Sequence, residues 1–294
     1  MAIITEDGDN SFWEEVYAGA VEAGKEYNAY VEQTGDGLVN RPSIEDAMNM
    51  AIYENVDGIL LRPSNEDKIQ PLIDKAYDHG IPVITMQKDV PDSKRQGFVG
   101  INDYFLGQEY GKRVLKIADE DTCLVTVLFP GSSFLPISRN WFRQGLINTV
   151  PQDQFQFDFQ LIWDDKGLNN AEDVIHDMMV GDTRQPDVII CLDDVITQSA
   201  YRLIRDRGLS DEIRIIGSYV SDDILDGIRQ GYIDSTITVD PEAMGRMSIE
   251  ALMTYKKYHM VSYYTEVDTR LVDQSSAAEY QEEKQNGGDG DVEN

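Results

Sequence analysis

Aromatic and hydrogen-bonding side chains follow several apolar segments of this sequence. Near the start, Asn10 precedes Phe12 and Trp13 at the point where a helix is expected to begin. The others directly follow predicted strands; they are Gln87 with Lys88 and Asp89, Trp163, and Asp193 with Asp194. Sugar rings present C–H faces to aromatic rings and hydroxyls to amides, carboxylates and guanidinium groups. Together these residues favour a carbohydrate site, whereas any single aromatic could equally be a core residue.

The elements that position these residues are short apolar runs alternating with amphipathic helical patterns. The runs read as buried strands, at 56–61, 81–86, 98–101, 123–129, 187–192 and 213–217. Helical spacing of apolar residues marks the stretches 13–24, 106–115 and 171–179. Strands that alternate with helices predict an α/β fold with parallel sheets covered on both faces. Ligands of such sheets bind outside the carboxyl ends of the strands.

A repeat predicts two similar domains. ENVDGILLRPSNED (54–67) and RQPDVIICLDDVIT (184–197) share an Asp, an aliphatic run and a polar turn that opens a helix. The length of 294 residues is sufficient for two domains with a core each. The seam is expected near 100–105. The acidic, Gly-rich stretch 275–294 lacks apolar periodicity and is expected to be a disordered tail.

The charge balance argues against nucleic acid and anionic lipid surfaces as partners. Lys and Arg number 25 against 54 Asp and Glu, so the formal net charge is −29. This field repels nucleic acid and anionic lipid surfaces. No apolar stretch approaches the roughly 20 residues of a membrane span.

The sequence gives no positive signal for enzyme activity, a cofactor or a metal. It contains no G-x-S-x-G elbow, no P-loop and no G-x-G-x-x-G after a strand. His79, His176 and His259 lie at spacings that suit no metal, and we interpret them as surface or supporting residues. Cys123 and Cys191 lie in predicted strands and read as small core residues, with a disulfide left open.

The order of several segments resembles one family. DNSFWEEVYAGAVEAGKEY is similar to its N-P-F-F motif and following helix, and VDGILLRPSNED to a strand and P-x-D turn. IPVITMQKDVPDSKRQGFVGINDYFLGQ is similar to the segment that reaches the first crossover, and IIGSYVSDDILDGIRQGYIDSTITVDPEAMG to the closing block. Over residues 2–273 the chain therefore resembles the periplasmic sugar-binding proteins of the ribose-binding type. These are the type I solute receptors of ABC importers, and they share a fold with the ligand domains of LacI-type repressors.

The resemblance implies roles for individual residues. Asn10 would be a polar ligand contact, and Phe12 and Trp13 would stack on a sugar ring that Trp163 covers from the other domain. Arg139 lies with Asn140 and Trp141 where the family has its binding arginine, and Arg143 competes for that role. The remaining implied contacts are Gln87, Lys88, Asp89, Asp193, Tyr219 and Asp240.

Three positions depart from the family pattern. Gln87 stands where the family has a ligand Asp, with Asp89 two residues on as a substitute. Tyr219 replaces an Asp, and Val239 replaces a Gln before the Asp-Pro step. These changes put ribose in doubt and leave another pyranose, a disaccharide or a non-sugar polar ligand open.

The resemblance also implies a domain organisation and partners. Two doubly wound lobes, 1–102 with 240–266 and 103–239 with 267–274, would be joined by three crossover strands that act as a hinge. A monomeric receptor outside the cytoplasm would deliver a neutral sugar to an ABC permease. We expect a removed export leader, such as a lipoprotein signal, although the residues alone leave a cytosolic protein open. The rival functions are a LacI-type regulator and a sensory module for a membrane histidine kinase.

Overall fold

The computed structural model describes residues 1–5, 11–35, 41–63, 66–118, 123–131, 136–163, 171–180 and 184–288. The chain forms two compact units. Unit 1 comprises Met1–Ile101 and Val239–Asp268, and unit 2 comprises Asn102–Thr238 and the segment from Thr269 onwards. The chain passes between them three times, within two residues of the domain boundaries expected from the sequence.

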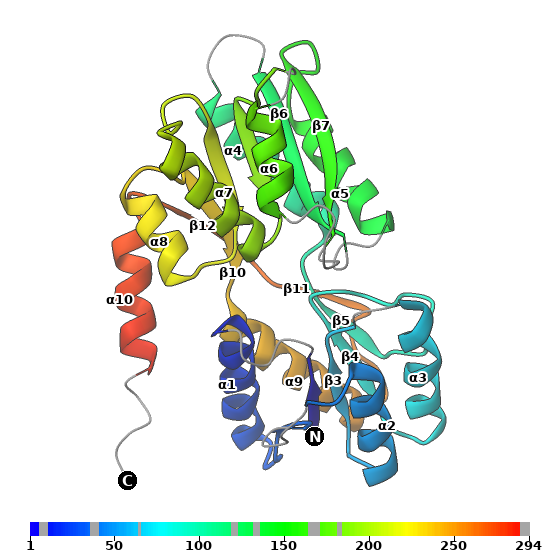
Figure 1. Ribbon diagram of the computed structural model, residues 1–294. Helices are drawn as coiled ribbons and strands as arrows, with labels where there is room; N and C mark the ends of the chain where they lie inside the picture. Colours follow the sequence, from blue (N-terminus) through cyan, green and yellow to red (C-terminus); the bar gives the residue numbers. More distant parts are fainter. Residues whose placement is uncertain are drawn as a thin grey trace. The chain divides into compact units, whose positions relative to one another are not determined.

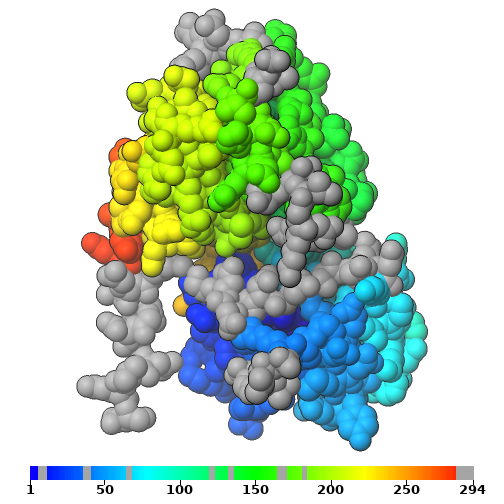
Figure 2. Space-filling view, in the orientation of Figure 1, coloured from blue at the N-terminus to red at the C-terminus, as the bar shows by residue number. Residues whose placement is uncertain are grey.

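Unit 1 is a six-stranded sheet in the order β2-β1-β3-β4-β5-β11, with parallel pairing between all neighbours. Its strands are β1 (Ala2–Ile4), β2 (Glu32–Gln33), β3 (Ile59–Leu61), β4 (Val83–Met86), β5 (Gly97–Gly100) and β11 (Tyr264–Glu266). Its helices are α1 (Ser11–Glu26), α2 (Ile44–Glu54), α3 (Glu66–Asp78) and α9 (Pro241–Tyr258). Figure 2 shows α1, in dark blue, beside α2 and α3, in blue to cyan, on the visible face of this unit.

Unit 2 repeats this order with β7-β6-β8-β9-β10-β12, and the pairs from β7 to β10 are parallel. Its strands are β6 (Cys123–Pro130), β7 (Phe155–Ile162), β8 (Val188–Cys191), β9 (Arg214–Ser218), β10 (Ser235–Val239) and β12 (Thr269–Asp273). Its helices are α4 (Asp103–Ile117), α5 (Pro136–Thr149), α6 (Ala171–Val180), α7 (Asp194–Arg207), α8 (Asp222–Arg229) and α10 (Ala277–Gly288). Figure 1 shows helices on both faces of each sheet.

The α/β prediction is confirmed in both units. Each of the six predicted strand segments contains a strand, because a parallel strand covered on both faces is buried throughout and reads as a continuous apolar run. Cys123 and Cys191 lie in such strands, and both are buried thiols that are not joined in a disulfide.

The prediction of a disordered tail is wrong for residues 277–288, which form α10. Ala277 and Tyr280 are three residues apart and belong to the core cluster of unit 2. The guanidinium of Arg270 on β12 lies 4.9 Å from the Tyr280 ring centroid. These buried contacts therefore anchor α10 to the core of unit 2, although the polar composition of the segment predicts no helix there.

One pair of helices in each unit is in backbone contact. A Cβ added at Gly245 of α9 would lie 1.9 Å from the Val16 carbonyl oxygen of α1. In unit 2, a Cβ added at Gly145 of α5 would lie 2.0 Å from the Tyr104 carbonyl oxygen of α4. Only glycine permits this approach. The close pairs hold α1 against α9 and α4 against α5, and all four helices begin at the carboxyl edges of the two sheets.

Candidate functional site

The carboxyl edge of unit 1 carries an arginine, an amide and an indole in one group. Arg62 directly follows β3, and its Nε donates to Oε1 of Gln87, which directly follows β4, at 2.9 Å. The Arg62 guanidinium also lies 5.5 Å from the centroid of the Trp13 ring. Arg62 is buried, so this edge holds a desolvated guanidinium beside hydrogen-bonding and stacking partners.

Phe12 and Trp13 lie in the first turn of α1 and pack on each other. Their ring centroids are 5.2 Å apart in an edge-to-face arrangement, and Trp13 is only 5% exposed. The aromatics that open this helix are therefore part of the packing of unit 1, and Trp13 supports Arg62. Their contact with a ligand stays a prediction. Asn10 lies outside the described residues.

Gln87 and Tyr219 occupy the same place in the two units, directly after the fourth strand in chain order of each. Both have φ of 62°, in the left-handed region that a side chain disfavours. The Gln87 amide donates to the Val99 carbonyl at 3.0 Å, and the Tyr219 amide donates to the Ile237 carbonyl at 3.1 Å. Strained backbone of this kind is concentrated at ligand-binding positions.

Buried hydrogen bonds support the turn at Tyr219. Its carbonyl accepts from Thr236 Oγ1 at 2.5 Å. The preceding residue, Ser218, donates through Oγ to the Cys191 carbonyl at 2.8 Å and lies 2.6 Å from the Tyr110 hydroxyl. Burial raises the pKa of Tyr110 and of Cys191, so both stay protonated. This neutral network holds the ends of β8 and β9 together.

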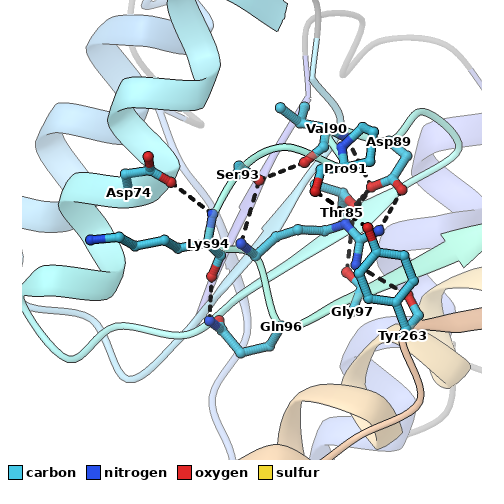
Figure 3. A network of polar contacts seen from close by, with 11 residues as sticks. Asp74, Thr85, Asp89, Val90, Pro91, Ser93, Lys94, Gln96, Gly97 and Tyr263 are labelled. Atoms are coloured by element: carbon cyan, nitrogen blue, oxygen red, sulfur yellow. Dashed lines mark hydrogen bonds and ion pairs between the residues drawn. The ribbon is translucent and has the colours of Figure 1, made fainter. Parts of the chain in front are cut away.

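Asp89 is engaged within unit 1 (Figure 3). Its Oδ1 accepts from Thr85 Oγ1 at 3.0 Å, from the Val90 amide at 2.8 Å and from Arg95 Nε, and its Oδ2 accepts from Arg95 Nη2 at 2.5 Å. Arg95 also donates through Nη1 to the Tyr263 carbonyl at 3.1 Å. Asp89 therefore fastens the link between β4 and β5. These contacts lend no support to its predicted role as a ligand contact, and they assign none to the adjacent Lys88.

Two indoles are exposed in unit 2. Trp163 directly follows β7 and is 47% exposed, and its ring lies so close to Gly131 that a Cβ there would be 2.7 Å away. Trp141, on α5, is 51% exposed. In contrast to Trp13, both rings offer an aromatic surface to a ligand.

Arg139 and Arg143 lie one turn apart on α5 and have different surroundings. The Arg143 guanidinium lies 4.3 Å from the centroid of the Phe159 ring. Arg139 Nη1 is buried and has no hydrogen-bond partner among the described residues. A buried donor without a partner costs about 1–3 kcal/mol, a cost that a bound acceptor removes. This difference favours Arg139 over Arg143 as the ligand arginine.

Asp193 and Asp240 are helix caps. Asp193 Oδ1 accepts from the Val195 amide at 2.8 Å at the start of α7. Asp240 Oδ1 accepts from the Ala243 amide at 2.9 Å at the start of α9. Both therefore have a structural role at the expected strand ends, and their ligand role stays a prediction.

The sequence analysis did not single out Arg62 or Ser218. Arg62 follows the strand in VDGILLRPSNED, so the rule that selected Gln87 would also have found it. Ser218 carries no comparable signal, because its contacts with Tyr110 and Cys191 depend on packing. Within the described segments, no group of three His, Cys, Asp or Glu could hold a metal ion, and no helix could span a membrane.

The comparisons with known proteins agree with this architecture. A family model described as a periplasmic binding protein domain matches residues 1–258, so the chain belongs to that family. A search of curated proteins finds no match.

Three similar solved structures share the fold. A sugar-binding protein of a sugar ABC transporter from Bacillus halodurans is 19% identical, with 95% of this chain and 98% of that chain covered and a TM-score of 0.82. GanP, a glucose-galactose binding protein from Geobacillus stearothermophilus, is 18% identical, with coverages of 93% and 96% and a TM-score of 0.81. The XylFII chain of a XylFII-LytSN complex is 24% identical, with coverages of 93% and 97% and a TM-score of 0.75.

Proposed function

We propose that this protein is an extracytoplasmic solute-binding protein that captures a small neutral sugar and delivers it to an ABC importer. The observation that carries the proposal is the pair of left-handed residues, Gln87 and Tyr219, at equivalent strand ends of a periplasmic binding fold. The function is binding without chemistry. The sugar-binding proteins among the similar structures support this ligand class.

The residues at the two carboxyl edges fit a sugar. Trp163 and Trp141 are exposed plates on which the C–H face of a ring could stack. Arg62 and Arg139 are guanidinium donors for hydroxyl oxygens, and Gln87 both donates and accepts. We propose that a ligand hydroxyl accepts from the buried Nη1 of Arg139, which explains why that donor has no hydrogen-bond partner in the described part of the chain.

A thermal-shift screen against neutral sugars is the first test. A ligand at 100 times its dissociation constant adds about 2.7 kcal/mol to the free energy of unfolding. A hit should be lost in Arg139→Met and retained in Arg184→Met, a surface arginine paired with Asp187 at 2.8 Å. If no neutral sugar shifts the transition, the proposed ligand class is wrong.

The charge of the ligand is the second test. The net charge of −29 repels an anionic ligand, and Arg95 already neutralises Asp89. We therefore expect calorimetric titration to show tighter binding of a neutral sugar than of its phosphate or uronic acid. Tighter binding of the acid would contradict the neutral class, and a cationic amino sugar is the second choice.

Ligand capture would work by closure of the two units about the three crossings. The crossings fall at Ile101–Asn102, Thr238–Val239 and Asp268–Thr269. Domain closure by hinge motion is known for periplasmic binding proteins. Solution scattering should show a smaller radius of gyration with saturating ligand, and tight binding without compaction would contradict the mechanism.

A second function is favoured by one comparison. The similar XylFII chain was solved in complex with LytSN, so signalling through a membrane sensor kinase is an alternative to transport. Pull-down with the permease and with the sensor domain encoded nearest to this protein, with and without sugar, separates the two. Binding of the sugar-loaded protein to the sensor alone would replace the importer assignment. A LacI-type regulator is the remaining alternative, and a helix-turn-helix upstream of Ile3 would favour it.

A further inference from the structure

Unit 2 contains a pocket at the edge of its sheet opposite the carboxyl edge. Its volume is about 340 Å³, within the roughly 300–1,000 Å³ that small-molecule sites occupy. Every residue that lines it belongs to unit 2. Arg214 begins β9 and Asp234 directly precedes β10, so the pocket lies at the amino edge. The side chains of its lining that matter here are Arg113, Arg214, Ile228, Ile233, Asp234 and Asp273.

Part of the lining is apolar. Ile228 and Ile233 are buried members of the core cluster of unit 2. Gly231 lies between them in the chain, with φ of 81° in the left-handed region. A Cβ added at Gly231 would have no heavy atom within 4 Å, so the backbone there borders open space. A small hydrocarbon group in the pocket would therefore find an apolar surface on the two isoleucines.

Two carboxylates in the pocket share one buried arginine. Arg113 donates through Nε to Asp234 Oδ2 at 2.7 Å, and its Nη1 donates to Asp273 Oδ2 at 3.4 Å. All three side chains are less than one fifth exposed. Hydrogen bonds from the hydroxyl and the amide of Ser275, together with the charge of Arg113 and Lys116, hold the pKa of Asp273 below its usual value. With both carboxylates ionised, this group of three has an excess negative charge.

One donor group and one acceptor atom of the pocket remain uncommitted. Asp234 Oδ2 accepts from Arg113 and from Ser235 Oγ, whereas no described residue donates a hydrogen bond to its Oδ1. Arg214 is exposed, and its guanidinium has neither an ion pair nor a hydrogen bond with any described residue. The pocket therefore offers a ligand a free carboxylate oxygen beside the negative group and a free guanidinium.

The buried arginine of unit 1 is covered instead. The Arg95 side chain is only 1% exposed, and the Tyr263 ring lies over its guanidinium, with 3.9 Å to the ring centroid. Arg113 of unit 2, which also holds an edge strand, lines the pocket. The shared fold therefore does not require an open pocket beside such an arginine, and its presence in unit 2 comes from the local sequence.

We propose that this pocket binds an α-amino acid with a small aliphatic side chain, at a site separate from the proposed sugar site. The ligand carboxylate accepts from the Arg214 guanidinium, the ammonium group donates to Asp234 Oδ1, and the side chain packs on Ile228 and Ile233.

A zwitterion suits the charges of the pocket better than a simple ion does. A simple anion would meet the carboxylates of Asp234 and Asp273, and a simple cation would meet the guanidinium groups of Arg113 and Arg214. A zwitterion presents the opposite charge to each group. It has no net charge, so the chain's net charge of −29 does not repel it.

Calorimetric titration with three matched probes tests this assignment. L-valine has both charged groups, isovalerate lacks the ammonium group and isobutylamine lacks the carboxylate. We expect valine to bind, and each of the other two to bind about 10-fold more weakly or worse, because each loses one charge-assisted contact. Equal affinity of either shorter probe would overturn the proposal, as would the absence of binding by alanine, valine and leucine.

Two arginine variants locate the site. Arg214→Gln should weaken valine binding by about 10-fold or more and leave sugar binding unchanged, whereas Arg139→Met should lose sugar binding and retain valine binding. Arg202→Gln removes another exposed arginine and is the matched control, which should bind valine as the wild type does. Thermal unfolding verifies that each variant is folded. Valine binding that is lost in Arg139→Met and retained in Arg214→Gln would place the amino acid at the carboxyl edge, and would overturn both this proposal and the sugar assignment.

Discussion

The two units share their strand order, and they also share the geometry at the strand ends where a ligand is expected. Gln87 and Tyr219 have the same φ and donate to the equivalent neighbouring strand. The side chains around them differ. Unit 1 packs Trp13 beneath Arg62, whereas unit 2 exposes Trp141 and Trp163. The shared fold therefore determines where a site can form. The side chains differ, because unit 1 offers a buried arginine beside an amide and unit 2 offers exposed aromatic rings.

The units also fasten their edge strands in the same way. In unit 1, Arg95 is buried against Asp89 and bonds the carbonyl of Tyr263, the residue before β11. In unit 2, Arg113 on α4 lies 2.6 Å from Asp234, at the start of β10, and 3.4 Å from Asp273, at the end of β12. Both edge strands follow the last crossings of the chain, so one buried arginine in each unit holds the segment that closes its sheet.

The largest expected effect comes from removing these arginines. Arg95→Gln leaves Asp89 without its charge partner, and Arg113→Gln leaves both Asp234 and Asp273 without theirs, so the free energy of unfolding should fall by about 3–5 kcal/mol in each variant. Chemical denaturation measures it. If the units unfold in separate transitions, each variant should shift only its own.

A surface pair provides the control. Arg202 and Asp223 are exposed and 3.5 Å apart, so Arg202→Gln should change the free energy of unfolding by less than about 1 kcal/mol. Equal effects of Arg95→Gln and Arg202→Gln would show that burial does not matter here.

The close helix pairs predict the next effect. Gly245→Ala and Gly145→Ala should each lower the free energy of unfolding by about 3 kcal/mol, because the added methyl meets a carbonyl oxygen of the facing helix. Helix propensity alone predicts the opposite sign, a gain of about 1 kcal/mol. Thermal unfolding decides between them, with Ala18→Val on the exposed side of α1 as control.

The tryptophans sharpen the difference between the units. Trp163→Ala should weaken sugar binding by about 1–3 kcal/mol and leave stability nearly unchanged, because the ring is half exposed. Trp13→Ala should weaken both, because the ring is buried and supports Arg62. Titration and thermal unfolding of both variants give the two quantities, and unchanged affinity in Trp163→Ala would remove that residue from the site.

Much of the fold could be predicted because buried parallel strands leave a local signal. All six apolar runs that the sequence analysis named as strands contain a strand. Helix α10 was not predicted, because its buried apolar contacts are Ala277 and Tyr280 in an otherwise polar segment. Its stability comes from packing on unit 2, which no local pattern records.

The places of the candidate residues in the fold were predictable from the sequence. Gln87, Trp163 and Asp193 lie after strands, as expected. The sequence did not predict what each residue contacts. Arg62 donates to Gln87, which is 25 residues away in the chain, and Arg95 donates to Asp89. Register between neighbouring strands creates the first contact and loop geometry the second, and neither can be read from the sequence alone.

The two helices that follow crossings, α4 and α9, each carry an acid with a raised pKa in the first turn. Burial raises the pKa of Asp103 to about 6, although a hydrogen bond from Ser138 opposes the shift. In unit 1, burial raises the pKa of Glu242, and the carboxylates of Asp240 and Glu15 add to it. Both acids lie within a few residues of a crossing.

The smallest effect that we predict follows from Asp103. A carboxyl whose pKa is higher in the folded state stabilises the fold below its unfolded value of 3.8, and this contribution is lost as the pH rises through about 6. Asp103→Asn should therefore match the wild type near pH 4 and exceed it at pH 7. The gain should be about 1–2 kcal/mol, after a discount for the part of the side chain that solvent reaches. Glu242→Gln, whose acid is also shifted upward, should show the same sign. Unfolding measured across this pH range decides it, because a variant less stable than the wild type at pH 7 would mean that the ionised Asp103 stabilises the start of α4.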